Sequence, residues 1–266
     1  MHICTKLTKG FYATELCIKK GDKMKQSIFT VDTNVAIAKD VYKMTLCGDT
    51  SHITASGQFV NIKIDGLFLR RPISVCDVDG NVLTLIYKVV GEGTEVMSKM
   101  PSGTELDVLT GLGNGYDLSL SGDTPLLVGG GVGVPPMYYL CRLLVKEGKK
   151  PSVILGFNSK DDVFYEEEFK ALGCEVRVAT ADGSYGIKGF VTDAMDNLSY
   201  THFFTCGPEP MLKALSDKTV TSGQLSFEER MGCGFGACMG CSCKTKYGNK
   251  RICKDGPVLV KEEVIW

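Results

Sequence analysis

Five of the twelve cysteines of this chain lie close together near its C-terminal end: Cys233, Cys238, Cys241, Cys243 and Cys253. Four residues separate the first two and two residues separate the next pair, which is the ligand spacing of plant-type iron–sulfur proteins. Glycines stand between these cysteines, and glycine lets a backbone wrap closely around a cluster because it tolerates positive φ. The spacing predicts a [2Fe–2S] cluster on Cys233, Cys238, Cys241 and Cys253.

The fifth cysteine and the identity of the metal leave choices open. One residue separates Cys243 from Cys241, so we expect it to point to the opposite face of an extended chain and leave it out of the ligand set. The alternative to a cluster is a four-cysteine zinc site, which would make the segment a zinc-stapled interaction module. Structural zinc sites favour paired C-x2-C units, and this segment has one such unit, so the spacing favours the cluster.

Three short motifs in the first half of the chain could together bind a flavin nucleotide. They are Arg71-Pro72-Ile73-Ser74, Ile86-Tyr87-Lys88 and Gly93-Thr94. They offer a cation, hydroxyl groups and a helix start, whose free N–H groups can face a pyrophosphate. Taken alone, Arg71 is better explained as an exposed charge at a strand end. Tyr87 could stack on a ring, although a tyrosine in a strand is more often a packing residue.

Two further motifs follow strands of the second half and indicate a nucleotide site. The first is the turn Gly129-Gly130-Gly131-Val132-Gly133-Val134-Pro135-Pro136, and the second is Cys206-Gly207-Pro208. The dinucleotide fingerprint G-x-G-x-x-G does not fit the first turn in either register. Both turns nevertheless lie where open α/β sheets bind ligands, at the carboxyl ends of strands. By itself, Cys206 is better explained as a core cysteine.

The elements that must position these motifs change along the chain. Residues 26–121 contain short alternating segments and the hairpin signal Asp79-Gly80-Asn81, which predict an antiparallel β-barrel. A short helix capped by Thr94, with Val96, Met97 and Met100 on its apolar face, is expected there. Residues 122–222 alternate strand and helix patterns, which predicts an α/β domain with a parallel sheet. Its expected helices include residues 161–172 and 190–195.

The remaining segments complete an α+β multidomain protein. Residues 223–266 are too short to hold a core without a metal. Residues 1–25 form an N-terminal extension without an assigned function. The net charge of −1, from 30 Lys plus Arg and 31 Asp plus Glu, disfavours nucleic acid as a partner. No secretory signal and no uninterrupted apolar stretch of membrane length is present, so we expect a cytoplasmic protein without a membrane partner.

These motifs in combination resemble a known group of reductases. A barrel with R-P-x-S and a later G-T, a GGGxGxxP turn and a C-G-P motif are similar to the ferredoxin–NADP reductase superfamily. The cysteine segment narrows the resemblance: residues 229–241 and 253–257 are similar to the electron-transfer subunits of two-subunit (class 1B) dihydroorotate dehydrogenases. The resemblance covers about residues 27–264 and leaves the N-terminal extension out.

The resemblance implies cofactors and roles. FAD would be held by Arg71, Pro72, Ile73 and Ser74, would lie along Ile86, Tyr87 and Lys88, and would place its phosphates at Gly93 and Thr94. Gly130, Gly131, Gly133, Cys206, Gly207 and Pro208 would form the NAD side. The family partner is an FMN-containing catalytic subunit that oxidises dihydroorotate to orotate in pyrimidine biosynthesis, in an assembly of two copies of each subunit.

The chain itself offers no catalytic residue for dihydroorotate. Its three histidines lie in no motif, and no nucleophile and base stand together. A flavin exchanges two electrons with a hydride carrier and one with an iron–sulfur cluster, so the expected cofactors suit electron transfer. The alternative within the same class is the small flavin and iron–sulfur subunit of another NAD(P)H reductase complex, such as a ferredoxin:NADP or sulfite reductase.

Overall fold

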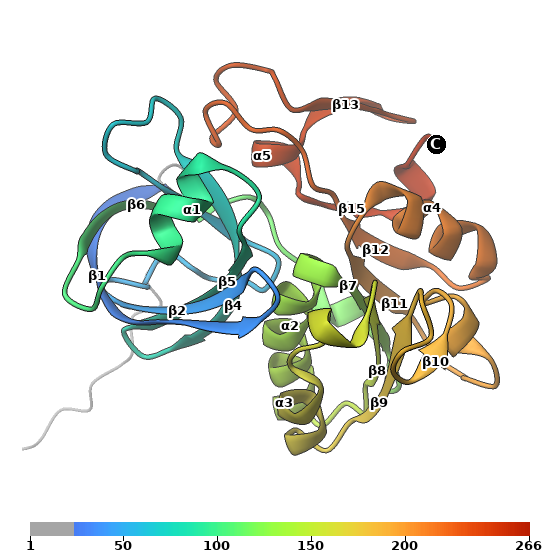
Figure 1. Cartoon of the computed structure of the whole chain (residues 1–266). Helices are drawn as coiled ribbons and strands as arrows, with labels where there is room; N and C mark the ends of the chain where they lie inside the picture. The colour runs from blue at the N-terminus through green and yellow to red at the C-terminus, as the bar shows by residue number, and fades with distance from the viewer. Residues whose placement is uncertain (1–23) are drawn as a thin grey trace, which may run out of the picture.

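The computed structural model of the protein describes residues 24–266. The extension expected over residues 1–25 therefore lies outside the described residues, except for its last two. The described part forms a closed barrel, a seven-stranded sheet with helices on both faces, and a cysteine-rich C-terminal segment that contacts both (Figure 1). The fold class predicted from the sequence is confirmed.

The barrel consists of six antiparallel strands in the order β1-β2-β5-β4-β3-β6. Their bounds are β1 (Lys25–Ala38), β2 (Val41–Cys47), β3 (Phe59–Ile62), β4 (Arg71–Asp79), β5 (Val82–Lys88) and β6 (Glu105–Leu112), with helix α1 (Glu92–Ser98) between β5 and β6. Alternate residues of β5, Leu83, Leu85 and Tyr87, point into one core because successive side chains of a strand face opposite ways. The predicted hairpin is present, with Asp79 opposite Val82.

The large sheet has the order β10-β9-β8-β7-β11-β12-β15, and all its neighbours are parallel except β12 and β15. The strands are β7 (Leu126–Gly130), β8 (Ser152–Phe157), β9 (Glu175–Thr180), β10 (Ile187–Lys188), β11 (Phe203–Cys206), β12 (Gly223–Ser226) and β15 (Val258–Val260). The helices are α2 (Val134–Lys146), α3 (Glu166–Ala171) and α4 (Glu209–Lys218).

Two apolar cores lie on opposite faces of this sheet. Leu127 of β7 packs with α2 and α3 residues, whereas its neighbours Leu126 and Val128 pack with α4. Helix α2 also lies between the sheet and barrel strand β4, where Arg142 forms an ion pair with Asp77 at 2.6 Å. The barrel and the α/β part are therefore joined by a shared core and not only by the connecting chain.

The C-terminal segment contains the hairpin β13 (Ser242–Thr245) and β14 (Gly248–Arg251) and the short helix α5 (Ile252–Asp255). Its buried side chains Cys241, Ile252 and Cys253 pack in one cluster with Phe59 and Leu109 of the barrel. The segment then returns to the large sheet as β15. Residues 223–266 thus combine cysteine loops with two strands of the α/β sheet.

Three helices expected from the sequence differ in the structure. Helix α1 begins at Glu92 after the cap Gly91, and Thr94 is its third residue, with a hydroxyl that accepts from Val90 N at 3.0 Å. Val96, expected on the apolar face of α1, is 41% exposed. Residues 161–172 are interrupted by Tyr165, whose φ of +67° ends helical geometry. The other differences follow from local side-chain bonds.

Residues 190–195 form only the short 3-10 turn η4 (Asp193–Met195). The Asp193 carboxylate accepts from Phe190 N at 2.7 Å, a local bond that competes with helix formation. A second 3-10 turn, η3 (Lys160–Asp162), takes the start of the expected helix over residues 161–172. The other 3-10 turns are η1 (Leu118–Leu120), η2 (Gly131–Gly133) and η5 (Lys261–Glu263).

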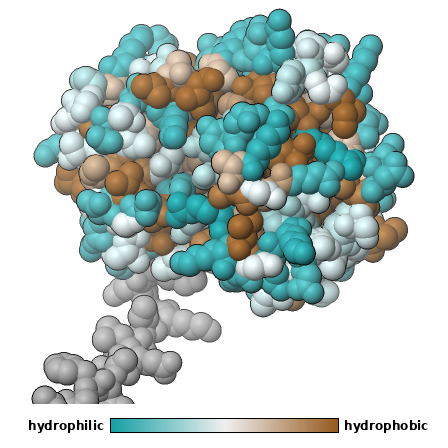
Figure 2. All heavy atoms as spheres, turned by 90° about the horizontal axis from the view of Figure 1, so that it is seen from below, coloured by the Kyte–Doolittle hydropathy of each residue, from teal (hydrophilic) through white to brown (hydrophobic). Residues whose placement is uncertain are grey.

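The surface seen from below in Figure 1 mixes apolar and polar side chains over both the barrel and the α/β part (Figure 2). Such mixing is usual for a face in contact with water. Within residues 24–266, no helix combines the length and apolar character needed to cross a bilayer.

Candidate functional site

Two cavities meet between the barrel and the large sheet. The nucleotide-side cavity, of about 440 Å³, lies at the carboxyl ends of β7, β8 and β9. The flavin-side cavity, of about 400 Å³, lies between β4 and β5 of the barrel and the start of the cysteine segment. Lys88 and Val132 line both cavities, so a ligand in one would lie next to a ligand in the other.

The flavin-side cavity gathers most of the residues expected to bind FAD. It is lined by Arg71, Pro72, Ile73, Ser74, Ile86, Tyr87, Lys88 and Thr94. Gly93 is not in the lining, but a Cβ at Gly93 would lie 2.0 Å from Nε of Arg71. The guanidinium therefore lies directly against the start of α1. This contact brings two of the three sequence motifs together and places a cation beside backbone N–H groups, as a pyrophosphate requires.

Tyr87 is oriented as a packing residue. Only 2% of it is exposed, its hydroxyl donates to Asn34 Oδ1 at 2.9 Å, and its ring stacks on Tyr42. Burial raises the pKa of the Tyr87 phenol above its ordinary value, although the Asn34 contact lowers it. The side chain thus belongs to the barrel core, while Tyr87 also lines the flavin-side cavity, so its contact with the flavin stays a prediction.

The glycine-rich turn forms the other wall, at the nucleotide side. Gly130 and Gly131 line the cavity together with Pro208. Gly133 and Gly207 do not line it but allow two backbones to meet: a Cβ at Gly133 would lie 2.1 Å from Cys206 O. Cys206 faces the flavin-side cavity instead. The two predicted nucleotide motifs are therefore adjacent, with their members divided between the two cavities.

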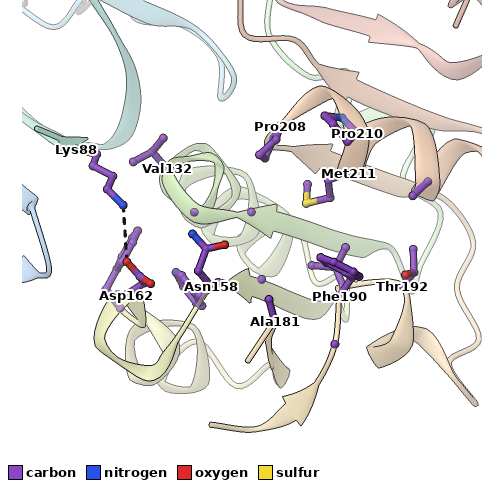
Figure 3. Close-up of a pocket in the computed structure, with 18 of the residues that line it drawn as sticks. Lys88, Val132, Asn158, Asp162, Ala181, Phe190, Thr192, Pro208, Pro210 and Met211 are labelled. Atoms are coloured by element: carbon purple, nitrogen blue, oxygen red, sulfur yellow. Dashed lines mark ion pairs between the residues drawn. The ribbon is translucent and has the colours of Figure 1, made fainter. Parts of the chain in front are cut away.

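An ion pair joins two residues that line the nucleotide-side cavity (Figure 3). Lys88, at the end of β5, lies 3.7 Å from Oδ1 of Asp162 in η3. The other oxygen of Asp162 accepts from Ser159 N and Ser159 Oγ at 3.2 and 2.9 Å. The carboxylate is thus fixed on one side and directed at the lysine on the other. Asp162 was not identified from the sequence, because a single acidic residue has no motif.

Glu228 is a second residue that the sequence analysis missed. It lines the flavin-side cavity with Ser226 and Cys206, and burial raises the pKa of its carboxyl above the ordinary value. Burial also raises the pKa of the Cys206 thiol, with the negative charge of Glu228 adding to the effect. Loss of hydration thus shifts both pKa values upward, because it penalises the charged form of each group.

The thiols of the cysteine segment interact in two pairs, Cys233 with Cys238 and Cys241 with Cys253. Cys233 Sγ accepts from the backbone N–H groups of Ala237 and Cys238 at 3.2 and 3.4 Å, and Cys241 Sγ accepts from Cys253 N at 3.3 Å. Within residues 24–266 no three metal-ligating side chains surround a single point. Two neighbouring thiol pairs suit a centre with two iron atoms, each of which takes two thiolates.

The electrostatics of Cys233 favour its ligand form. Burial opposes ionisation, but N–H groups of Cys238 and Phe235 and other neighbours outweigh it and lower the pKa of the Cys233 thiol to about 6. At the buried end, desolvation and the neighbouring Cys241 raise the pKa of Cys253 to about 12. A thiolate is the form that binds metal, so the donor set and the inward N–H groups fit an iron–sulfur cluster.

The expectation for Cys243 is wrong in its geometry. Residues two apart in an extended chain share a face, and Cys243 packs against the same apolar cluster as Cys241. Burial raises the pKa of the Cys243 thiol, with Glu229 and Cys241 adding to the shift. Cys243, which lies in β13 opposite Lys250, stays outside the proposed ligand set because the ferredoxin-type spacing and Cys253 already supply four thiolates.

Comparison with known proteins agrees with this layout. Residues 127–217 match the oxidoreductase NAD-binding domain, and residues 228–265 match the iron–sulfur cluster binding domain of dihydroorotate dehydrogenase B. The chain is thus an NAD-linked iron–sulfur oxidoreductase with a ferredoxin–NADP reductase-like fold, and the predicted class is confirmed. The predicted cofactor set of FAD, a [2Fe–2S] cluster and NAD is the one that this class uses.

The relatives narrow the class to one family. The chain is 51% identical over 257 residues to the electron transfer subunit of dihydroorotate dehydrogenase B (NAD(+)) of Fusobacterium nucleatum, covering 91% of this chain and 99% of that protein. It is 48% identical to the same subunit of Bacillus pumilus, covering 91% and 98%. This chain belongs to the family of dihydroorotate dehydrogenase B electron transfer subunits.

A solved structure shows the same fold over nearly the whole chain. It is an NADH-dependent reduced ferredoxin-NADP oxidoreductase, described in a study of flavin-based electron bifurcation. The TM-score is 0.81 at 31% identity, with 90% of each chain covered. The resemblance inferred from the sequence motifs is confirmed by both comparisons.

Proposed function

We propose that this chain passes electrons between NAD and a catalytic dihydroorotate dehydrogenase subunit in pyrimidine biosynthesis, through FAD and a [2Fe–2S] cluster. One observation carries the proposal: the flavin-side cavity lies between the other two sites. It shares Lys88 and Val132 with the nucleotide-side cavity, and its lining also includes Glu229 and Met231 of the cysteine segment. Three sites in a row are what stepwise electron transfer needs.

The parts of the chain divide this work. Residues 26–121 bind FAD, residues 122–222 bind NAD, and residues 223–266 hold the cluster. Bound FAD supplies the conversion between two-electron and one-electron transfer. The chain's own groups do the rest: Arg71 and the start of α1 bind phosphate, Val132 and Lys88 line both cavities, and Glu228 and Cys206 line the flavin side.

We assign Cys233, Cys238, Cys241 and Cys253 as the cluster ligands. Each replacement by serine is expected to lose or destabilise the iron, because the four thiolates act as one chelate. Cys243→Ser is the matched control and is expected to retain iron. Iron and sulfide analysis of the purified variants measures this. Retention by Cys253→Ser together with loss by Cys243→Ser contradicts the assignment.

The partner is an FMN-containing catalytic subunit, and the assembly contains two copies of each chain in the cytoplasm. The family name of the relatives, a subunit that transfers electrons, supports a separate catalytic chain. Nucleic acid and membrane are not among the partners. Co-purification with the FMN subunit and the mass of the complex in solution test both the partner and the stoichiometry.

An absorption spectrum gives the decisive test of the function. The purified chain is expected to show flavin and iron–sulfide bands together, and NADH is expected to bleach both. A colourless protein that binds zinc is the outcome that supports the interaction-module alternative. Flavin and cluster bands without NADH bleaching would also contradict the proposal.

A second candidate is the small subunit of a ferredoxin:NADP reductase complex. The solved oxidoreductase with 31% identity supports it, because its fold covers 90% of this chain. The 51% and 48% identical relatives support the dihydroorotate function more strongly. Electron delivery to or from ferredoxin, without stimulation by the FMN subunit, is the result that favours the second candidate.

A further inference from the structure

Strand β3 faces the barrel core on one side and the cysteine segment on the other. Val60 and Ile62 pack in the barrel core, whereas Phe59 packs with Cys241 and Cys253. Asn61 lies between Val60 and Ile62 in the sequence, so its side chain points the same way as that of Phe59. The outward face of β3 thus presents one apolar and one polar side chain to the segment that holds the proposed cluster ligands.

The amide of Asn61 contacts the first of those ligands. Its Nδ2 donates to the backbone oxygen of Cys233 at 3.3 Å, and only 1% of the residue is exposed. The next residue of the loop, Gly234, has a φ of +80°, and a Cβ there would lie 2.4 Å from Asn61 Nδ2. The loop is therefore shaped to admit this amide. The buried Oδ1 of Asn61 has no hydrogen-bond partner among the described residues.

The backbone of Asn61 is held firmly on the barrel side. Asn61 is paired with Pro72 of β4, which lines the flavin-side cavity. Its carbonyl oxygen also accepts from Arg70 Nη1 at 3.3 Å, and the Arg70 guanidinium is anchored by Asp107 at 2.8 Å. One residue therefore links the strand beside the proposed flavin to the peptide of Cys233.

We propose that Asn61 is a positioning residue that holds Cys233 against the flavin strand and tunes the reduction potential of the cluster. Hydrogen bonds, charge and exposure around a cluster set its potential. The N–H end of the amide is directed at the Cys233 peptide, and a positive dipole end favours the reduced, more negative cluster. The inference rests on the proposed function, because it requires a cluster on Cys233.

The test compares Asn61→Leu with a matched variant, Asn114→Leu. Asn114 also ties the cysteine segment to the barrel, with Nδ2 donating to Val258 O at 2.8 Å, but none of its hydrogen bonds within residues 24–266 is to a cysteine. A third variant, Asn61→Asp, keeps the shape and replaces the donor by a negative charge. Each chain is purified with its cofactors, and the midpoint potential and EPR spectrum of the cluster are measured together with iron and sulfide content.

Asn61→Leu is expected to lower the midpoint potential of the cluster and to alter its EPR signal. Asn61→Asp is expected to lower the potential further. Asn114→Leu is expected to change neither the potential nor the EPR signal. Loss of iron from Asn61→Leu with full iron in Asn114→Leu also supports the role. Unchanged potentials and spectra in both Asn61 variants at full iron content overturn this inference alone. Equal iron loss in Asn61→Leu and Asn114→Leu overturns it too. An unsubstituted chain without iron and sulfide overturns it together with the proposed function.

Discussion

Arg71 is the residue on which flavin binding is expected to depend most. Its guanidinium lies against Gly93 in the flavin-side cavity. A charge-assisted hydrogen bond contributes about 1.5–3 kcal/mol, which is roughly 10- to 150-fold in affinity. Arg71→Ala is therefore expected to make FAD dialysable while the iron, held by other residues, stays bound. The flavin-to-iron ratio of the purified variant measures this, with Arg177→Ala on β9 as the control. An unchanged ratio would mean that Arg71 is only an exposed strand-end charge.

Glu228 is exposed as a residue, but desolvation of its carboxyl is expected to make the stability of the chain depend on pH. Burial raises the pKa of its carboxyl above 4.5, so the folded chain binds this proton more tightly than the unfolded chain. The stabilisation that the bound proton contributes is complete when the pH is below the pKa of this carboxyl in the unfolded chain. It is lost as the pH rises through the pKa of the carboxyl in the folded chain. Glu228→Gln is expected to unfold at a higher temperature than the unsubstituted chain at pH 8 and at the same temperature at pH 4. Equal melting temperatures at both pH values contradict this.

The residues found from the sequence are those that belong to motifs. Cys233, Cys238 and Cys241 are recognisable because their spacing follows from the chemistry of the cluster. Glu228 and Asp162 are not recognisable from the sequence, because neither belongs to a motif and each lines a cavity only in the folded chain. Asn61 is of the same kind: its partner Cys233 is 172 residues away in the sequence.

At the scale of elements, strands and turns were predicted better than helices. The hairpin between β4 and β5 follows from Asp79-Gly80-Asn81, and Gly80 has the positive φ that such a turn requires. The helix expected over residues 190–195 does not form, because the Phe190 N–H donates to the Asp193 carboxylate. Local side-chain bonds of this kind decide whether a short polar segment becomes a helix, and a periodic pattern does not reveal them.

The close contact between the turn η2 and the end of strand β11 allows a prediction about a pair of elements. Gly133 has an ordinary φ of −80°, but an added Cβ would lie 2.1 Å from Cys206 O and 2.7 Å from Gly207 N. Gly133→Ala is expected to lower the free energy of unfolding by about 1–3 kcal/mol, as overpacking does, and to weaken NADH binding because it separates the two nucleotide motifs. Gly91→Ala is the control, since nothing lies within 4 Å of that position. Similar denaturant midpoints for the two variants would contradict the steric argument.

At the scale of the whole molecule, the proposed cofactor sites run from the nucleotide-side cavity to the outer edge of the cysteine segment. Cys238 is exposed there, and the neighbouring Phe235 and Met239 are 44% and 55% exposed. The proposed electron path thus ends at the surface and not in a substrate pocket. The order of the parts was predictable from motifs along the chain. Their contact was not, because it depends on α2 and the cysteine segment packing against the barrel.

This layout predicts a division of activities between two chains. Purified alone with its cofactors, the chain is expected to oxidise NADH with an artificial acceptor, because that reaction needs only the nucleotide and flavin sites. It is not expected to oxidise dihydroorotate, because its three histidines lie in no motif and no nucleophile and base stand together in the sequence. Adding the FMN subunit should restore NAD-dependent orotate formation, and the cysteine segment should become protected from solvent in hydrogen exchange. Robust orotate production by the isolated chain would contradict the division, and so would protection confined to the far side of the barrel.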